Sequence, residues 1–356
     1  MNLSSSRLFI KLSALSFALS IVGYAQASHS QASAQDRAQV VATFSVLCDL
    51  TEQIAETTVD VTCLIGAGED PHVYSATPAD RRAIEDADLV LYGGYGFEPA
   101  IIQMIEATDT AAPKVAVSEA AVPEPLEGEH HEHGDEEHGD EEHGDEEHGE
   151  EHGDEEHGGE HGDEETMEAD PHVWHDAKNG IAMVKEIQAQ LSEVSPENAA
   201  LYETNAAALI SQLEQLDTWI QTQIDTVPES GRTLISTHDA LGYYANAYGL
   251  EIEPALDSFS TEVRPSAAAI RELVEVVKET SVPSIFVEST SNPGLIEAVA
   301  RETDIAVSED PIYADSLGEA GTAAASYQGM LVTNTCTIVE GLGGTCDKTT
   351  VQAALE

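Results

Sequence analysis

The sequence predicts an α/β protein of two lobes, each with a mainly parallel sheet flanked by helices, joined by one long rigid α-helix. Short β-branched runs alternate with helical patterns of about ten residues, which is typical of parallel sheets covered by helices. The alternation resumes in the second half, and the helical pattern between the halves is too long for one lobe. With 356 residues, the chain is long enough for a lobe over 36–194, a linking helix over 195–227 and a lobe over 228–356.

The first 27 residues have the pattern of a secretory signal peptide. Arg7 and Lys11 precede an apolar run, and Ala25-Gln26-Ala27 offers small residues to a signal peptidase. A membrane anchor is the alternative, but serines interrupt the run, which is too short for about 30 Å of hydrocarbon. No Cys follows at the position of a lipid anchor. We therefore expect residues 1–27 to be removed and the mature chain to be periplasmic.

In the first lobe, the β-branched runs predict parallel strands and the segments between them predict helices. The expected strands are 40–44, 59–65, 88–94 and 114–118, and the expected helices are 45–58, 77–87 and 97–107.

The linking helix has clear start signals. Asp176 can cap a helix that runs to about 194, and Ser195-Pro196 supplies an N-cap and a first-turn proline for the next one. Apolar residues then keep a 3.6-residue period up to the break at Pro228, namely at Leu209, Leu213, Leu216 and Ile220. We interpret this helix as a stiff strut between the lobes.

The second lobe repeats the pattern of the first. The expected strands are 232–239, 250–256, 282–290 and 304–309, and helices are expected near 239–248, 265–280, from Pro293, and 322–341. In open α/β sheets, ligands bind at loops beyond the carboxyl ends of strands. The loops that hold His72, His238 and Asp315 are therefore the places to look for a site.

Residues 127–168 form an acidic insert rich in His and Gly, with the composition of a disordered segment. Its histidines recur mostly every five residues, which matches neither helix nor strand. We interpret them as weak metal sites that collect zinc, in preference to a solubilising linker. They are His130, His131, His133, His138, His143, His148, His152, His157 and His161. Deleting 129–165 should remove weak sites and leave one tight site.

The net charge excludes some classes of binding partner, and the cysteine content indicates disulfides. The formal net charge of −53 argues against nucleic acid and anionic lipid as binding partners, because such a surface repels both.

The chain has an even number of cysteines, Cys48, Cys63, Cys336 and Cys346, and in an oxidising compartment this favours disulfides. Three pairings are open, and the short separations favour Cys48–Cys63 and Cys336–Cys346. A thiolate metal site is the alternative, but the spacings are not those of zinc sites.

One pentapeptide pattern occurs twice, as Asp70-Pro71-His72-Val73-Tyr74 and as Asp170-Pro171-His172-Val173-Trp174. Each places an imidazole after a proline that stiffens the loop. A lone His is more often a surface or hydrogen-bonded residue, but the duplication favours metal ligands. His175 does not share the pattern, and we expect it to contact a ligand or to be solvated.

Two further candidates lie in the second lobe. His238 follows an apolar strand, where a helix-capping role is equally compatible, and Asp315 lies in a Gly-rich loop where a turn or cap would be ordinary. With His72 and His172 they form four N/O ligands, a set suited to tetrahedral Zn²⁺. An Mn²⁺ site would have more oxygen ligands than this set supplies, and Ca²⁺ or Mg²⁺ prefers ligand shells made only of oxygen.

Four ordered motifs resemble the zinc and manganese substrate-binding proteins of bacterial ABC importers, closest to zinc receptors of the ZnuA type. They are DPHVYSATPADRRAIEDADLVLYGGYGFE, ADPHVWHDAKNG, STHDALGYYANAYGL and YADSLGEAGTAAASYQGM. The resemblance implies metal held between two lobes by His72 and His172 on one side and His238 and Asp315 on the other. The manganese branch usually has Glu at the place of His238, and water can replace Asp315 in zinc members. Relatives usually have Leu at the place of His175.

The expected function is therefore capture of Zn²⁺, as cargo, by a monomeric receptor that delivers it to the membrane permease of an ABC importer. The alternatives are a manganese or iron receptor of the same family, a periplasmic zinc buffer, and a metallohydrolase. No H-E-x-x-H motif supports the hydrolase. Because imidazole must be neutral to bind metal, affinity should fall below about pH 6.5.

Overall fold

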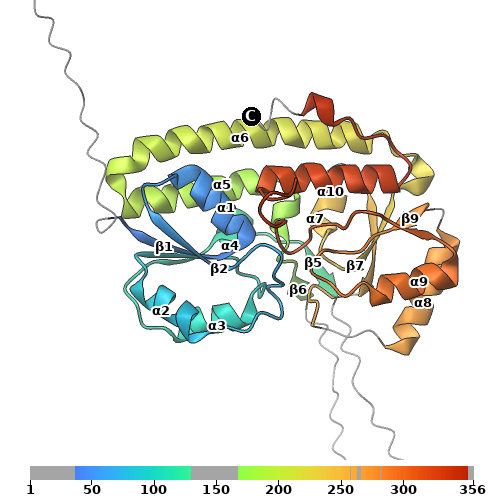
Figure 1. Ribbon diagram of the computed structural model, residues 1–356, viewed down its shortest axis with the longest axis horizontal. Coiled ribbons are helices and arrows are strands. Elements are labelled where there is room, and N and C mark those ends of the chain that lie inside the picture. The colour runs from blue at the N-terminus through green and yellow to red at the C-terminus, as the bar shows by residue number, and fades with distance from the viewer. Residues whose placement is uncertain (1–36, 130–166, 257, 263–265, 281, 352–356) are drawn as a thin grey trace, which may run out of the picture. The chain divides into compact units, whose positions relative to one another are not determined.

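The computed structural model describes residues 37–129, 167–256, 258–262, 266–280 and 282–351. These residues form one compact unit, an α/β fold in which parallel strands are flanked by helices (Figure 1). The predicted signal peptide and the nine histidines of the insert lie outside the described residues. Among the described helices, none is long and apolar enough to cross a bilayer.

The first sheet is wholly parallel, with strand order β2-β1-β3-β4. Its β-branched strands are the predicted ones, and residues 40–44 of the central strand are fully or almost fully buried. The strands are β1 (Gln39–Phe44), β2 (Asp60–Ile65), β3 (Leu89–Tyr92) and β4 (Lys114–Ala116). The helices are α1 (Ser45–Ala55), α2 (Pro78–Asp86), α3 (Pro99–Ala107) and the short α4 (Val117–Ala121).

The second set of strands repeats this order. β7 pairs in parallel with β8, β9 pairs in parallel with β10, and the Phe286 N–H donates to Ile235 O (2.9 Å), joining the two pairs as β8-β7-β9-β10. The strands are β7 (Thr233–His238), β8 (Glu251–Leu256), β9 (Ser284–Ile285) and β10 (Ala306–Val307). The helices are α7 (Gly242–Tyr248), α8 (Ala267–Glu279) and α9 (Gly294–Thr303).

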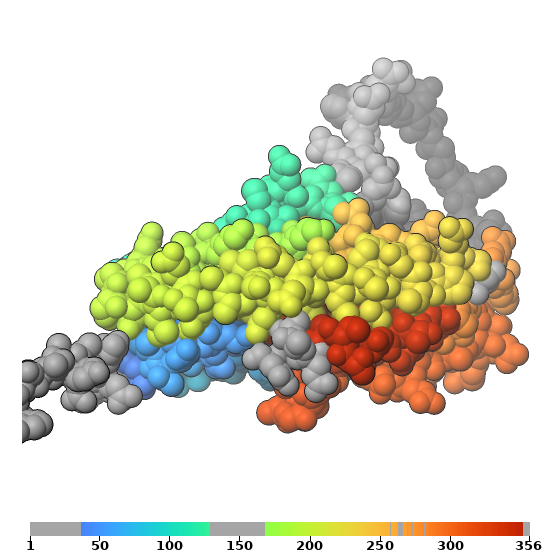
Figure 2. Space-filling view, turned by 90° about the horizontal axis from the view of Figure 1, so that it is seen from above, coloured from blue at the N-terminus to red at the C-terminus, as the bar shows by residue number. Residues whose placement is uncertain are grey.

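Three longer helices cover one side of the strands (Figure 1). α6 (Ala199–Ile224) runs along both sets, α5 (Ala177–Val194) lies on the half that holds β1, and α10 (Tyr327–Gly341) lies on the half that holds β7. α6 has 26 residues, a length of about 39 Å. Near its start, Asn205 Nδ2 donates to Ile54 O of α1, and near its end Gln221 Nε2 donates to Tyr248 O of α7. Figure 2 shows α6 exposed along one face. The linking helix is shorter than expected, because a 3₁₀ turn (Pro196–Asn198) precedes it; the lobe boundaries remain predictions.

The insert is shorter than predicted. Residues at both of its ends form an antiparallel ribbon of β5 (Glu127–Glu129) and β6 (Met167–Ala169), so 127–129 and 167–168 belong to the fold. The expectation that these residues are irregular was wrong. Glu129 pairs with Met167, which places the two ends of the intervening segment side by side.

Both disulfides favoured by the short separations are present. Cys48 of α1 bonds to Cys63 of β2, and Cys336 of α10 bonds to Cys346 in the tail that follows it. Among the described residues no cysteine is free, so the cysteines do not form a thiolate metal site.

Candidate metal centre

The duplicated pentapeptide forms the same turn twice. Asp70 Oδ1 accepts a hydrogen bond from the His72 N–H (3.0 Å), and Asp170 Oδ1 accepts one from the His172 N–H (2.9 Å). A carboxylate that accepts from the backbone two residues on is an Asx turn, and the proline between them fixes φ. Each imidazole therefore projects from a locally rigid loop.

The other two candidates lie at the end of one strand of the second half and after another. His238 is the last residue of β7, and Asp315 lies in the loop after β10. Thr290 Oγ1 donates to Asp315 Oδ2 (2.8 Å). On α10, the Asn334 side chain accepts from the Tyr313 N–H (2.9 Å) and donates to Tyr313 O (2.8 Å). The loop that carries Asp315 is thus held beside α10.

The four side chains converge. The Nε2 atoms of His72, His172 and His238 and Asp315 Oδ1 all lie within 4.8 Å of one another. Asp315 Oδ1 is 3.4, 3.3 and 3.3 Å from the three Nε2 atoms in that order, and the Nε2 atoms of His72 and His172 are 3.4 Å apart. His72 is 5% exposed and the other three are fully buried.

Aromatic rings form one wall of this cluster. The ring of Phe97 meets those of His72 (5.0 Å between centroids) and His172 (5.6 Å) edge-on, and it packs on Trp174 (4.7 Å). Phe44, at the end of β1, packs against Phe97 and Trp174. All three aromatic rings are fully buried, which excludes water from that side.

Carboxylates orient two of the imidazoles. His172 Nδ1 is 2.8 Å from Asp170 Oδ1, and His238 Nδ1 is 2.5 Å from Glu288 Oε2. Glu288 Oε1 also accepts from the N–H groups of Thr237 (2.9 Å) and His238 (3.1 Å). A carboxylate at Nδ1 places the proton there and leaves the Nε2 lone pair free for a cation.

Glu288 is a functional residue that sequence reasoning missed. Its signal is a carboxylate directly after the apolar run Ile285-Phe286-Val287, at the end of a predicted strand. It is 1% exposed, so the burial of its charge depends on the partners it finds at His238.

The electrostatics favour a cation. Burial opposes charge on His172 and His238, but Asp170 with Asp315 raises the pKa of the first, and Glu288 with Asp315 raises the pKa of the second well above its usual range. Burial would raise the pKa of Asp315, yet the three imidazoles hold it well below its usual range. Asp315 therefore stays ionised, and a divalent cation would displace imidazole protons on binding.

His175 is fully buried, which excludes solvation, one of the two expected alternatives. Its Nε2 is 2.8 Å from Ala314 O, and its Nδ1 has no hydrogen-bond partner among the described residues. Burial, together with His172, lowers the pKa of His175 to about 3. The ring is neutral, and because a carbonyl can only accept, Nε2 carries the proton.

A pocket of about 760 Å³ lies beside the cluster. Three of its lining residues are bonded to the candidate ligands or their turns: Asp70 to the His72 N–H, Thr290 to Asp315, and Thr261, whose Oγ1 donates to Asp70 Oδ2 (2.7 Å). The pocket thus reaches residues that hold the candidate ligands, although the four ligands themselves do not line it.

The chain has clear relatives. The family model ZnuA, "Zinc-uptake complex component A periplasmic", matches residues 40–341. The manganese-binding lipoprotein MntA of Bacillus subtilis (strain 168) is 31% identical over 314 residues, which cover 87% of this chain and 91% of MntA. The zinc-binding protein TroA of Treponema pallidum (strain Nichols) is 28% identical over 327 residues, which cover 90% and 94%.

A solved structure agrees with the fold. The periplasmic zinc binding protein TroA from Treponema pallidum matches with a TM-score of 0.72 at 28% identity, covering 86% of this chain and 99% of that chain. The family match spans both sets of strands and all four converging side chains. The relatives are named for manganese or for zinc, and members of the family are receptors, not enzymes. The chain therefore belongs to the ZnuA family of metal-binding receptors that serve ABC importers.

Proposed function

We propose that this chain is an extracytoplasmic receptor that binds one Zn²⁺ with high affinity through His72, His172, His238 and Asp315, and delivers it to the membrane permease of an ABC importer. The observation that supports zinc is the spacing of the donors. With ligands about 2.0–2.1 Å from zinc, the edge of a tetrahedron is about 3.3–3.4 Å. Four of the six separations among the donors are 3.3–3.4 Å, and the two from His238 to the other imidazoles are within 4.8 Å.

The arrangement of the rings supports the same geometry. The centroids of the three imidazoles are 5.4, 5.6 and 5.3 Å apart, so no two rings face each other across the cluster as opposite ligands of an octahedron would. Three nitrogen donors and one oxygen suit zinc better than manganese, which takes more oxygen.

A manganese receptor is the second candidate. It is favoured by the 31% identity to the manganese-binding lipoprotein MntA. Binding competition alone does not separate the two, because N/O sites hold zinc more tightly than manganese in either case. Delivery does: zinc should stimulate ATP hydrolysis by the reconstituted importer and manganese should not, and the reverse result would favour the manganese receptor.

The mechanism we propose begins with capture through the pocket beside Asp70. His72 and His172 supply two donors from turns of the first half, and His238 and Asp315 complete the shell from the second half. The carboxylates of Asp170 and Glu288 keep two imidazoles aimed at the ion, which reduces the freedom lost on binding. Binding then stabilises the closed arrangement that the permease reads.

The proposal also assigns roles to two segments outside the described part of the chain, the N-terminal 27 residues and the histidine-rich insert. We propose that 1–27 directs export to the periplasm and that the histidines between 130 and 161 collect zinc weakly near the tight site. A zinc buffer is the rival interpretation, because its main element would be this histidine tract. Stoichiometry separates the two: a receptor keeps one tight ion when the tract is removed.

The experiment is a chelator-competition zinc titration of three proteins from residue 28 onward: wild type, His238→Ala, and a deletion. In the deletion, residues 130–166 are replaced by Asn-Gly, a two-residue turn that closes β5 onto β6. The deletion should keep one tight ion and lose weak ones. His238→Ala should weaken the tight site by more than the about 10–100-fold typical of residues outside the ligand shell.

Loss of the tight site in the deletion would support the buffer instead. A tight site unchanged in His238→Ala would contradict the proposed ligand set. Delivery is then measured as zinc-dependent ATP hydrolysis by the reconstituted importer, which His238→Ala should fail to stimulate at limiting zinc.

A further inference from the structure

The carbonyl of Ala314 receives two donors from a distant segment. His175 Nε2 lies 2.8 Å from Ala314 O, and Trp174 Nε1 donates to the same oxygen at 3.2 Å. A carbonyl oxygen has two lone pairs, so these two bonds saturate it. All three residues are fully buried, where water cannot replace a lost donor.

The Ala314 carbonyl is adjacent in sequence to Asp315, one of the four candidate ligands. Ala314 directly precedes Asp315, so fixing the peptide plane between them fixes the direction in which the Asp315 side chain leaves the backbone. Thr290 fixes the other end by its bond to Asp315 Oδ2. The carboxylate is therefore held by its backbone and by its outer oxygen, which leaves Oδ1 aimed at the imidazoles.

The two donors belong to the turn that carries another candidate ligand. Residues Val173–His175 form a 3₁₀ turn that begins at His172. The hydrogen bonds from 174 and 175 to 314 thus join the loops of His172 and Asp315, which lie more than 130 residues apart in sequence.

We infer that His175 is a positioning residue for the cation site: its Nε2–H, bonded to Ala314 O, sets the orientation of Asp315 relative to His172. The inference rests on the proposed function, because it requires Asp315 to contact the bound ion. His175 itself does not bind the ion, since its proton-bearing nitrogen points to the carbonyl. Its removal should loosen one donor of four without removing any.

The test is a double-mutant cycle measured with zinc alone. His175→Leu removes the donor, and His175→Gln keeps an N–H at the same distance along the side chain. His175→Leu should raise the zinc Kd about 10–100-fold, and His175→Gln should restore most of the affinity. In an Asp315→Ala background, His175→Leu should change the Kd by less than about threefold, because its effect acts through the lost carboxylate.

Co²⁺ gives a second readout that a purely structural role would not move. Four-coordinate Co²⁺ absorbs visible light far more strongly than five- or six-coordinate Co²⁺, so His175→Leu should weaken the band and His175→Gln should retain it. The melting temperature of the metal-free variants checks folding. Equal losses from His175→Leu with and without Asp315 would overturn the inference alone, whereas unchanged zinc binding in Asp315→Ala would overturn the proposed ligand set as well.

Discussion

Glu98 is a fully buried carboxyl group away from the cation cluster. Its Oε1 accepts from Thr43 Oγ1 and from the Gly93 N–H, both at 2.6 Å, and its Oε2 has no hydrogen-bond partner among the described residues. Burial raises the pKa of Glu98 to about 7, with the two hydrogen bonds acting in the opposite direction. The native state therefore binds a proton that the unfolded chain releases at lower pH.

This predicts a pH-dependent loss of stability. The contribution is fully present below the unfolded pKa of about 4.5 and disappears as pH rises through about 7. Relative to Glu98→Gln, which is neutral throughout, the wild type should lose up to about 3 kcal/mol of unfolding free energy over this range. Urea unfolding of both metal-free proteins at several pH values measures it. Parallel stability curves would contradict the prediction.

The local part of the site was predictable from sequence, and the part that depends on strand neighbours was not. The Asx turns at His72 and His172 need only an Asp two residues earlier and a proline, so the duplicated pentapeptide is sufficient to predict them. The bond from Glu288 to His238 requires β9 to lie next to β7, a pairing between residues 50 apart. The ligand role of the four side chains stays a prediction until an ion is measured.

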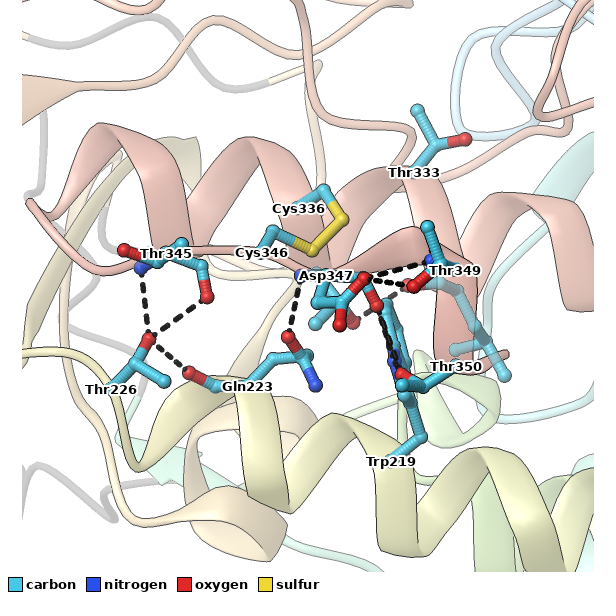
Figure 3. Close-up of a disulfide and its surroundings, with 12 residues drawn as sticks. Trp219, Gln223, Thr226, Thr333, Cys336, Thr345, Cys346, Asp347, Thr349 and Thr350 are labelled. Atoms are coloured by element: carbon cyan, nitrogen blue, oxygen red, sulfur yellow. Dashed lines mark hydrogen bonds between the residues drawn. A yellow bond between two sulfur atoms is a disulfide. The ribbon is translucent and has the colours of Figure 1, made fainter. Parts of the chain in front are cut away.

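At the scale of elements, the tail after α10 is fastened to α6 (Figure 3). Trp219 Nε1 donates to Asp347 O (3.1 Å), the Asp347 N–H donates to Gln223 Oε1 (2.8 Å), and the Thr345 N–H donates to Thr226 Oγ1 (2.9 Å). The disulfide between Cys336 and Cys346 closes the short loop between α10 and this tail.

Removing this disulfide should cost stability without undocking the tail. A sequence separation of 10 gives a loop-closure contribution of about 3 kcal/mol. The double variant Cys336→Ser with Cys346→Ser should therefore lose about 2–3 kcal/mol in guanidinium unfolding, while the hydrogen bonds to Trp219 keep the tail on α6. The pair Cys48→Ser with Cys63→Ser, at a separation of 15, is the matched control and should lose about as much. An unchanged midpoint in the first variant would refute the estimate.

Elements with local start signals were predicted well. Asp176 caps α5 by accepting from the Lys178 N–H, and Thr77 with Asp80 forms a capping box at α2. The ribbon of β5 and β6 was missed because its three-residue strands are Glu- and Gly-rich on one side and have no periodic pattern. They pair because the chain returns to the same place, which local propensity does not encode.

At the scale of the whole described fold, several hydrogen bonds join the first half of the chain to the second. The hydrogen bond from Thr261 Oγ1 to Asp70 Oδ2 joins residues 191 apart, and Asp70 also forms the turn that presents His72. A second bridge runs from the Leu126 N–H to the Tyr243 hydroxyl (2.9 Å).

Thr261→Val should therefore speed release of the proposed zinc ion. The hydrogen bond is made to a carboxylate and contributes about 1.4 kcal/mol or more to the closed arrangement, so the dissociation rate should rise about tenfold. Stopped-flow mixing of the zinc-loaded protein with excess chelator measures the rate, and Thr261→Ser, which keeps the hydroxyl, should behave as wild type. A valine variant that releases zinc at the wild-type rate would show that this contact does not restrain opening.

Because Glu129 pairs with Met167, the junction between β5 and β6 can accept inserted segments of different length and sequence. A flexible loop of any length between them starts and returns at the same place, and each doubling of that length costs only about 0.6 kcal/mol. Histidine tracts can thus grow or shrink during evolution without disturbing either sheet. A fluorescent reporter grafted at the same junction would sit three residues from Asp170, close enough to turn ion capture into an optical signal.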